Sequence, residues 1–239
     1  MAPQVGNGIN VPSGGWTFGG ETPAAFEDHV TGSIPFYAQC HDLIVDLAAH
    51  LVPAGGRCYD LGCSTGTLTT RLAELLAPRR AEVIGVDREP GMVELATERS
   101  GGLPYIRFET AALEELTLER ADLVISYYSL QFLPVSSRRQ VVGHIRRALD
   151  RGGSLILFEK VLAPTARDQE VATGVYQDWK LRQGYNDEEI AAKTRSLRGV
   201  LQPQSSADND SMLRAAGFAE VIQVFRWIVF EGVVARVAT

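Results

Sequence analysis

The 239-residue sequence predicts an α/β fold with a mostly parallel β-sheet. Three observations predict this fold. Short apolar segments alternate with helical ones between residues 57 and 160, a glycine-containing loop follows the first of them at 60–66, and two β-rich segments close the chain at about 219–226 and 228–237. Strands that alternate with helices imply right-handed βαβ units and therefore a parallel sheet.

The first 20 residues are rich in Gly, Pro and Asn, and they predict a flexible arm ahead of one domain over residues 21–239. Trp16 and Phe18 lie in this arm. Because a solvated tail gains nothing from aromatic side chains, we expect the arm to fold over something, as a lid. Residues 22–51 predict two helices with a break near Pro35, because proline interrupts a helix.

The alternating region supplies most of the predicted sheet. The predicted strands are 57–61, 81–87, 106–108, 121–127 and 153–160, and the predicted helices between them are 65–76, 90–99 and 136–149. After Lys160 the pattern changes to inserted helices over 167–183, 187–200 and 207–216, with glycines at their boundaries. The β-rich pair that follows adds one antiparallel strand, which is the methyltransferase version of a Rossmann-like sheet.

Composition limits the kind of protein this is. Hydrophobic residues make up 45% and charged residues 22%, as in an ordinary globular protein. No apolar run reaches the ~20 residues of a membrane helix, and the N-terminus has no basic start or apolar core, so we expect no membrane contact and a cytoplasmic location. The net charge of −6 argues against direct nucleic-acid binding, which needs a basic surface.

The three cysteines, Cys40, Cys58 and Cys63, do not form a disulfide framework, and the chain has no Cys-x-x-Cys pair. We therefore expect neither disulfides nor zinc, and we predict no metal among the cofactors. The three thiols are expected to be reduced and packed in the interior, where free cysteine is commonly found.

The loop from Asp60 to Gly66 is the predicted ligand site, since it joins a strand to a helix N-terminus. Gly62 and Gly66 allow a tight turn and a close approach of ligand to backbone. Asp87 ends the next strand 27 residues after Asp60, and its two carboxylate oxygens can accept both hydroxyls of a ribose. A dinucleotide site needs G-x-G-x-x-G, which this loop lacks, and Asp60 suits a ligand ammonium. The loop therefore predicts S-adenosylmethionine (SAM) rather than NAD.

The same loop reads Gly62-x-Ser64-x-Gly66, which is also the nucleophile-elbow pattern of α/β-hydrolases. Such an enzyme needs an acid and then a histidine later in the chain. His144 is the last histidine and lies in the middle of a predicted helix, so the hydrolase interpretation is not supported. Ser64 is better explained as a small residue that keeps the ligand close.

Short motifs spread over nearly the whole chain after residue 15 form a second pattern. They are Trp16-Thr17-Phe18, Ile34-Pro35-Phe36-Tyr37, Tyr59-Asp60-Leu61-Gly62-Cys63-Ser64, Leu130-Gln131-Phe132-Leu133, Gly152-Gly153, Glu159-Lys160, Gly184-Tyr185, Arg195-Ser196 and Ala216-Gly217-Phe218. In these motifs the chain resembles the carboxy-S-adenosyl-methionine synthase family, whose enzymes have a methyltransferase fold and convert SAM to its carboxylated sulfonium with prephenate. The loop is shared by many methyltransferases, whereas the motifs near both ends are more specific.

The resemblance implies roles for individual residues. It implies that Tyr37 and the stretch Gly62-Cys63-Ser64 contact the cofactor, and that Asp87 binds the ribose with Arg88 beside it. It also implies that Arg195 crosses from a neighbouring subunit to hold the added carboxylate, a task that suits a bidentate guanidinium. The expected assembly is therefore a homodimer that acts on a small-molecule substrate. Without the resemblance, Arg195 is more simply a solvated helix charge.

Two positions depart from the family pattern. The family has Asp where this chain has Ala112, so backbone groups near Ala112 and Leu113, or Glu114, are expected to meet the adenine. The family has Asn where this chain has Tyr127, at a strand end expected to face the sulfonium. An aromatic face near a cation is worth roughly 0.5–2 kcal/mol, and Tyr176 is a candidate second wall of such a cage. Ordinary packing explains Tyr176 equally well.

Several functions are consistent with this sequence. The first is carboxy-SAM synthesis. The second is internal cyclisation of SAM to azetidine-2-carboxylate with release of methylthioadenosine. Tyr127 and Tyr176 would form a dry aromatic cage, and Asp60 would hold or deprotonate the amine, directly or through water. The third is methyl transfer to a small natural product, for which Glu159 is the best candidate base. A SAM-binding regulator ranks last, because no effector-binding or DNA-binding module is recognisable.

Overall fold

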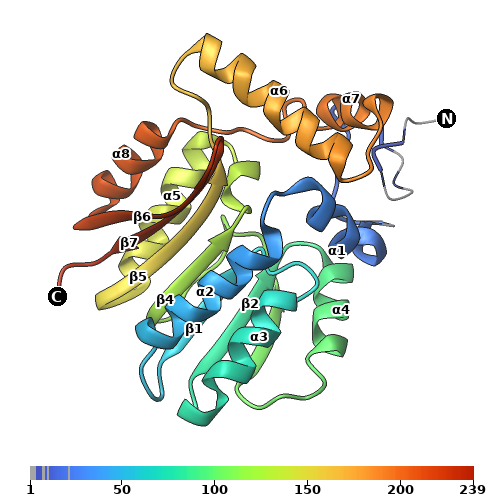
Figure 1. The fold of residues 1–239 in the computed structure, drawn as a ribbon. Helices are drawn as coiled ribbons and strands as arrows, with labels where there is room; N and C mark the ends of the chain where they lie inside the picture. Colours follow the sequence, from blue (N-terminus) through green and yellow to red (C-terminus); the bar gives the residue numbers. More distant parts are fainter. Residues whose placement is uncertain (1–3, 7–8, 10, 21) are drawn as a thin grey trace.

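The computed structural model describes residues 4–6, 9, 11–20 and 22–239. At its centre is a seven-stranded sheet with the order β3-β2-β1-β4-β5-β7-β6 (Figure 1). The strands are β1 (Arg57–Leu61), β2 (Glu82–Asp87), β3 (Ile106–Thr110), β4 (Ala121–Tyr127), β5 (Leu149–Lys160), β6 (Glu220–Trp227) and β7 (Phe230–Arg236). β7 runs antiparallel to both of its neighbours, and the other pairs are parallel, which confirms the predicted methyltransferase-type sheet.

Helices cover both faces of the sheet. α2 and α3 lie in front of the sheet in Figure 1, and α5 and α8 lie behind it. Ile44 of α2 and Leu72 of α3 belong to the core of one face, whereas Val142 of α5 and Leu213 of α8 belong to the core of the other. The α-helices are α1 (Thr22–Ser33), α2 (Tyr37–Leu51), α3 (Thr67–Leu76), α4 (Pro90–Arg99), α5 (Val135–Ala148), α6 (Ala166–Arg182), α7 (Asp187–Ser196) and α8 (Ser206–Ala216).

One helix boundary differs from the prediction in an informative way. α7 ends at Ser196 rather than at residue 200, because a turn follows in which Gly199 has a φ of 75°. α1 and α2 are separated near Pro35 as expected, with Phe36 in the left-handed region at a φ of 60°. In the described part of the chain, no helix has both the length and the apolar character to cross a bilayer.

The N-terminal arm is packed, which corrects the expectation of a flexible arm for its described residues. Val5, Val11 and Trp16 are buried in a small cluster with Ala192 of α7. The backbone N–H groups of Gly14 and Trp16 donate to the carbonyl groups of Arg195 (2.9 Å) and Ser196 (3.2 Å). The high content of Gly, Pro and Asn in the arm predicted flexibility, although the arm also contains the apolar side chains that make this contact. Residues 1–3, 7–8 and 10 of the predicted arm lie outside the described residues.

The sheet order places a ligand site. From β1 the chain proceeds to β2 and β3 on one side, and then crosses to β4 on the other side of β1. In open α/β sheets, ligands bind at the carboxyl ends of the strands where the order reverses in this way. β1 and β4 end side by side there, with Leu61 paired to Ser126.

Candidate active site

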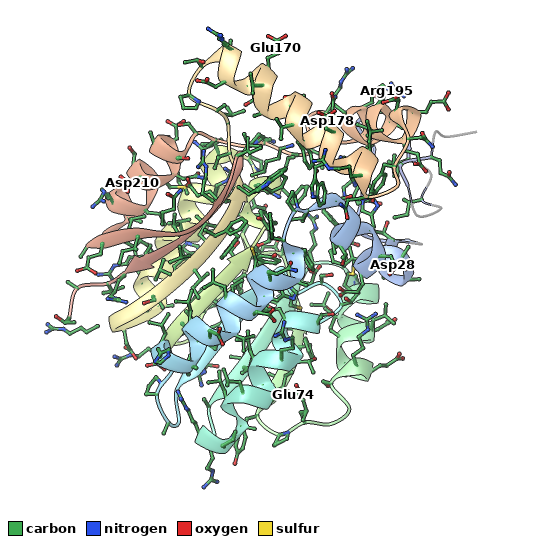
Figure 2. All side chains as sticks on the ribbon, in the orientation of Figure 1. Asp28, Glu74, Glu170, Asp178, Arg195 and Asp210 are labelled. Atoms are coloured by element: carbon green, nitrogen blue, oxygen red, sulfur yellow. The ribbon has the colours of Figure 1, made fainter. Side chains whose placement is uncertain are left out.

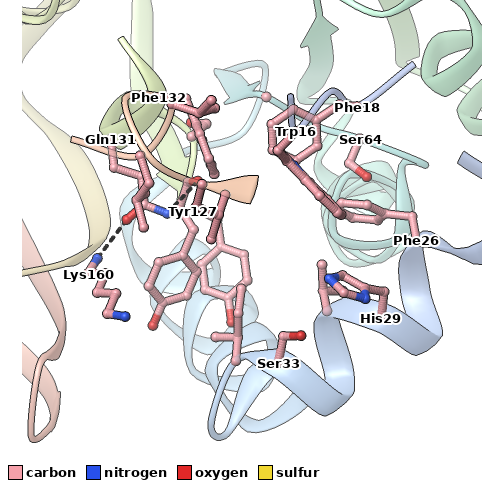
Figure 3. A pocket seen from close by; sticks show the side chains of 18 of the residues that line it. Trp16, Phe18, Phe26, His29, Ser33, Ser64, Tyr127, Gln131, Phe132 and Lys160 are labelled. Carbon is pink, nitrogen blue, oxygen red and sulfur yellow. Dashed lines mark hydrogen bonds between the residues drawn. The ribbon is translucent and has the colours of Figure 1, made fainter. Parts of the chain in front are cut away.

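A cavity of about 700 Å³ opens at this reversal point. Such a volume is within the range of small-molecule sites. Figure 3 shows Tyr127 and Lys160 on one side of it and Trp16, Phe18 and His29 on the other. The walls come from the arm, from α1 and α2, from the loops after β1, β2 and β4, and from α6, α7 and the turn after it.

The loop after β1 has the strained backbone that a close ligand approach requires. Gly62 and Gly66 have φ values of 78° and 77°, and Ser64 also lies in the left-handed region at 53°. A Cβ on Gly62 would stand 2.4 Å from the Cβ of Ser129, so the β4 end and the loop leave room for glycine alone. The loop, as predicted, lines the cavity with Gly62, Cys63 and Ser64.

Asp87 holds this loop in place. One of its carboxylate oxygens accepts the N–H of Ser64 at 2.9 Å, and the other accepts the N–H of Glu89 at 3.0 Å. Burial raises the pKa of the Asp87 carboxyl, and the bonds from Glu89 and Ser64 work against that shift. Each oxygen keeps a further lone pair, so Asp87 can accept ribose hydroxyls while it fixes the loop.

Asp60 lies beneath the loop and is 2% exposed. The Thr69 hydroxyl donates to its carboxylate at 2.6 Å. Burial raises the pKa of Asp60 to about 6, although the bond from Thr69 opposes this. A buried carboxylate without a cationic partner is unfavourable, so this site favours a ligand with a positive charge. Asp60 lines the cavity, where it can pair with a ligand ammonium.

The end of β4 forms an aromatic wall. The ring centroid of Tyr127 lies 5.1 Å from that of Tyr37, 4.9 Å from that of His41 and 4.7 Å from that of Tyr128. The Tyr127 hydroxyl donates to the Tyr37 carbonyl at 2.9 Å, which fixes the orientation of its ring. All four side chains line the cavity.

Tyr176 of α6 closes another side of the cavity. Its hydroxyl donates to the Ser33 carbonyl at 2.6 Å. The Nζ atoms of Lys160 and Lys180 lie 4.5 Å and 4.6 Å from the centroid of its ring. Protein cations already contact this ring, so an additional role as a cage for a ligand sulfonium is not required to explain it.

Several buried polar atoms of the wall have no hydrogen-bond partner among the described residues. They are both ring nitrogens of His29, Nε2 of His41 and the hydroxyl of Tyr128. Burial lowers the pKa of His29 to about 3 and that of His41 to about 4, so both rings are neutral. Buried polar groups are normally satisfied, and the three residues that carry these atoms all line the same cavity, so the cavity fits a polar ligand.

Most of the predicted site residues come together here. The cavity is lined by Tyr37, Asp60, Gly62, Cys63, Ser64, Asp87, Arg88, Leu113, Tyr127 and Tyr176. Ala112 is not among the lining residues, although its neighbours Leu113 and Glu114 are. Arg195 lies on the outer side of α7 and is exposed (Figure 2). Its assignment to a neighbouring subunit's site stays a prediction.

Glu159 is not placed to act as a base, which corrects that expectation. Its carboxylate accepts the N–H of Gln131 at 3.1 Å and lies 3.8 Å from the Arg138 guanidinium. Both side chains are almost fully buried, and Glu159 is not among the residues that line the cavity. Burial raises its pKa to about 8 despite Arg138. The side chain is therefore part of the packing between β5 and α5.

Sequence reasoning missed several lining residues, namely Glu27, His29, His41, Lys180 and Lys193. Glu27 accepts the Thr67 hydroxyl at 2.5 Å and also that of Thr65, so it anchors the start of α3. For the lysines a signal was present, because the chain contains only three and they are all in this cavity. For the histidines, no motif distinguished a cavity residue from a core residue.

Comparison with known proteins connects this site to two groups. The model of a family described as "Methyltransferase domain" matches residues 59–153. The carboxy-S-adenosyl-L-methionine synthase of Staphylococcus epidermidis is 32% identical over 221 residues, which cover 92% of this chain and 96% of that protein. The protein of the same name from Methylococcus capsulatus is 33% identical, with 91% and 92% covered.

Solved structures at lower identity share the fold. Human N-acetylserotonin methyltransferase, solved in complex with SAM, superposes with a TM-score of 0.61 at 18% identity and covers 91% of this chain and 56% of that one. Magnesium protoporphyrin IX methyltransferase from Synechocystis, solved with bound SAH, gives a TM-score of 0.60 at 21% identity, with 87% and 86% covered. These likenesses confirm the predicted methyltransferase fold.

Proposed function

This chain belongs to the carboxy-S-adenosyl-L-methionine synthase family, and we propose that it transfers a carboxyl group from prephenate to the methyl carbon of SAM. It is a SAM-dependent enzyme of methyltransferase fold. The observation that carries the proposal is the composition of one cavity. The cavity contains the loop and acids that suit SAM, and beyond them an aromatic and cationic region with room for a second molecule.

The proposed reaction balances without a further reagent. Prephenate loses CO₂ and hydroxide as its ring becomes aromatic, and the CO₂ becomes bonded to the carbon of the SAM methyl group. The proton lost from that methyl group combines with the hydroxide to form water. SAM supplies the activated methyl group, and the protein must position the two molecules and exclude bulk water.

The residues of this chain have separate tasks in the proposal. Asp87 binds the ribose, and Asp60 holds the ammonium of SAM. Tyr127 presents its ring to the sulfonium, an attraction of roughly 0.5–2 kcal/mol. Trp16 and Phe18 cover the cavity and limit the access of water. Arg195 of a neighbouring subunit pairs with the new carboxylate in a homodimer.

A second candidate is the cyclisation of SAM, and Tyr127 is the observation that favours it. The α-amine would form a bond to Cγ as the Cγ–S bond breaks, giving azetidine-2-carboxylate, methylthioadenosine and a proton. A dry aromatic wall at the sulfonium suits this displacement, since it holds the cation without supplying a nucleophile. Methyl transfer to another molecule has less support, because Glu159 does not face the cavity.

Mass spectrometry of the purified protein incubated with SAM separates these candidates. We expect carboxy-SAM to form only when prephenate is also present. Methylthioadenosine together with a four-membered imino acid from SAM alone would instead establish cyclisation and overturn the proposal. No product in either tube would direct the search to a methyl acceptor. The Asp87→Ala protein serves as the control that any turnover occurs at this site.

A further inference from the structure

The distribution of lysine in this chain is unusual. Of 23 basic residues, 20 are arginines and only Lys160, Lys180 and Lys193 are lysines. All three lysines line the cavity described above, and Lys160 and Lys180 also line a smaller one of about 170 Å³. The exposed cations elsewhere in the chain are arginines, so lysine is used only where a side chain faces the cavity.

Three separate elements bring these lysines together. Lys160 ends β5, Lys180 lies near the end of α6, and Lys193 lies in α7. Lys180 and Lys193 are only 5% and 7% exposed. The first two ammonium groups lie against the ring of Tyr176, and the Nζ of Lys193 lies 2.7 Å from the centroid of the Trp16 ring.

None of the three ammonium groups forms an ion pair within the residues that the structure describes. Burial lowers the pKa of Lys160 to about 8 and that of Lys180 to about 7, and Lys160 contributes to the second shift. Burial and Lys180 together lower the pKa of Lys193. The lysines therefore lie close enough to repel one another, and they have no acid to compensate them.

Five acids line the cavity, namely Glu27, Asp60, Asp87, Glu89 and Glu114, and none of them contributes to the pKa of any of the three lysines. Asp60 and Asp87 stand at the loop after β1, and Asp87 contributes to the raised pKa of Asp60. The cavity thus has an acidic end, which suits the ammonium and ribose of SAM, and a basic end that SAM leaves uncompensated. The SAM sulfonium adds another positive charge.

Unpaired neutral groups lie beside the lysines. Lys193 and Lys180 both contribute to the lowered pKa of His29, and neither ring nitrogen of that residue has a described partner. The Tyr128 hydroxyl is likewise buried without a partner. The ring of Tyr128 lies 6.0 Å from that of Phe230, which the Lys160 ammonium also contacts. The basic end therefore offers hydrogen-bond groups as well as charge.

Lysine suits such a place better than arginine. A buried amine can give up its proton while the cavity is empty of anions and regain it when an anion arrives, whereas a guanidinium stays charged. Its compact ammonium also donates three hydrogen bonds from one atom. The two arginines that also line the cavity, Arg88 and Arg198, are exposed, whereas Lys180 and Lys193 are buried.

We propose that Lys160, Lys180 and Lys193 form an anion-binding subsite that holds the carboxylates of a second, dicarboxylate substrate beside SAM. The inference rests on the proposed function for the identity of the reaction, but the subsite itself requires only a carboxylate ligand. The carboxylate of SAM itself is the other source of the same chemistry. Three cations and a cavity with space beyond the SAM loop favour a separate dianion.

Calorimetric titration of the protein saturated with S-adenosylhomocysteine tests the subsite without turnover. We expect prephenate to bind at least tenfold more weakly to Lys180→Met and to Lys193→Met than to the parent protein. Arg182→Met is the matched control, since it removes one cation from the exposed end of the same helix as Lys180, and its prephenate affinity should be unchanged. Melting temperatures of the two lysine variants should not fall, because each loses a buried uncompensated amine.

The affinities for S-adenosylhomocysteine and methylthioadenosine identify the source of the carboxylate. Both affinities should be unchanged in the lysine variants. A loss confined to S-adenosylhomocysteine would assign the lysines to the cofactor's own carboxylate and overturn the proposal. Prephenate affinity that does not respond to the lysine substitutions would also overturn it, whether or not carboxy-SAM is formed.

A probe that does not assume the donor's identity completes the test. Reductive ¹³C-methylation keeps the lysine charge, and its three lysine signals all report on this cavity. We expect malonate to shift them in the protein saturated with S-adenosylhomocysteine. Binding of prephenate to the protein saturated with S-adenosylhomocysteine, together with no carboxy-SAM from the protein supplied with SAM and prephenate, would refute the carboxyl-transfer function and leave the subsite standing. Failure of both dianions to bind would overturn the subsite.

Discussion

Asp60 is the residue whose protonation state the fold disturbs most directly at the SAM loop. Its pKa is raised from 3.8 to about 6 by burial, so the folded protein holds this proton more tightly than the unfolded chain does. Stability from this group is therefore present at low pH and is lost as the pH rises from about 4 to about 6. The shift corresponds to about 3 kcal/mol.

A ligand ammonium stabilises the ionised form of Asp60, so the binding of such a ligand should depend on pH. We expect the affinity for SAM to rise between pH 5 and pH 7 as Asp60 ionises, and we expect Asp60→Asn to remove most of this dependence. The asparagine can still accept the hydrogen bond from Thr69, so the substitution removes the charge of Asp60 and leaves this contact in place. Equilibrium dialysis across this pH range measures the effect. A profile unchanged by the substitution would separate Asp60 from the ammonium.

Asp87 is predicted to have two effects at once. Asp87→Ala removes the proposed ribose acceptor and also frees the N–H groups of Ser64 and Glu89. We expect SAM to bind roughly 10- to 100-fold more weakly, which corresponds to the roughly 1.5–3 kcal/mol of bonds to a charged group. The affinity of the Asp87→Asn variant for SAM should lie between those of the parent protein and the Asp87→Ala variant. An unchanged dissociation constant, measured by calorimetry, would mean that the ribose lies elsewhere.

At the scale of residues, sequence identified the SAM end better than the other end. Gly62 and Asp87 follow from spacing along one βαβ unit, because the chain itself fixes their separation. His29 and Lys193 could not be placed, since they meet only when α1 packs against α7 through Trp16. Ala112 shows the limit of transferring a role by resemblance. Its side chain offers no acceptor, and the cavity is lined by the residue after it.

At the scale of elements, the loop between β1 and α3 can be tested with a pair of glycines. Gly62 and Gly55 both have left-handed φ values, 78° and 69°. A Cβ on Gly55 meets nothing within 4 Å, whereas one on Gly62 meets Ser129. Gly55→Ala should cost about 1–2 kcal/mol of unfolding free energy, the penalty of the backbone conformation alone.

Gly62→Ala should cost roughly 2–5 kcal/mol, because overpacking adds to the same penalty, and it should also abolish SAM binding. Urea denaturation of both variants gives the comparison. If both variants lose the same unfolding free energy, the chain at Ser129 moves away from the new Cβ at no cost. Retained SAM binding in Gly62→Ala would show that the ligand does not approach this part of the backbone.

The elements themselves were largely predictable, and their exceptions have local causes. The strands of the parallel sheet follow from apolar runs bounded by turn residues, and β7 follows from its place at the chain end. α7 ends early because of the turn before Gly199. For the arm, Trp16 and Phe18 predicted that it folds over something, but its partner could not be predicted, since Val5, Val11 and Trp16 are too widely spaced to form a periodic pattern and Ala192 is far along the chain.

At the scale of the whole molecule, Arg195 makes a prediction about assembly. Its side chain is exposed and outside the cavity of its own chain, so a role with the carboxylate requires a second copy. We expect a homodimer in sedimentation, and we expect Arg195→Ala to spare SAM binding while removing any preference for carboxy-SAM. Equal losses for both ligands would mean that the side chain only supports the fold. A fully active monomer would refute the assembly.

The contact between the arm and α7 has a consequence for how the protein is made. Ser13 and the carbonyl of Arg195 are 182 residues apart in sequence, and the arm supplies Trp16 to the cavity wall. At ribosomal rates of about 5–20 residues per second, the arm leaves the exit tunnel roughly 10–40 s before its docking partner leaves it. During translation, the apolar arm must therefore stay free of aggregation, and the nascent enzyme cannot close its cavity on SAM until α7 has emerged.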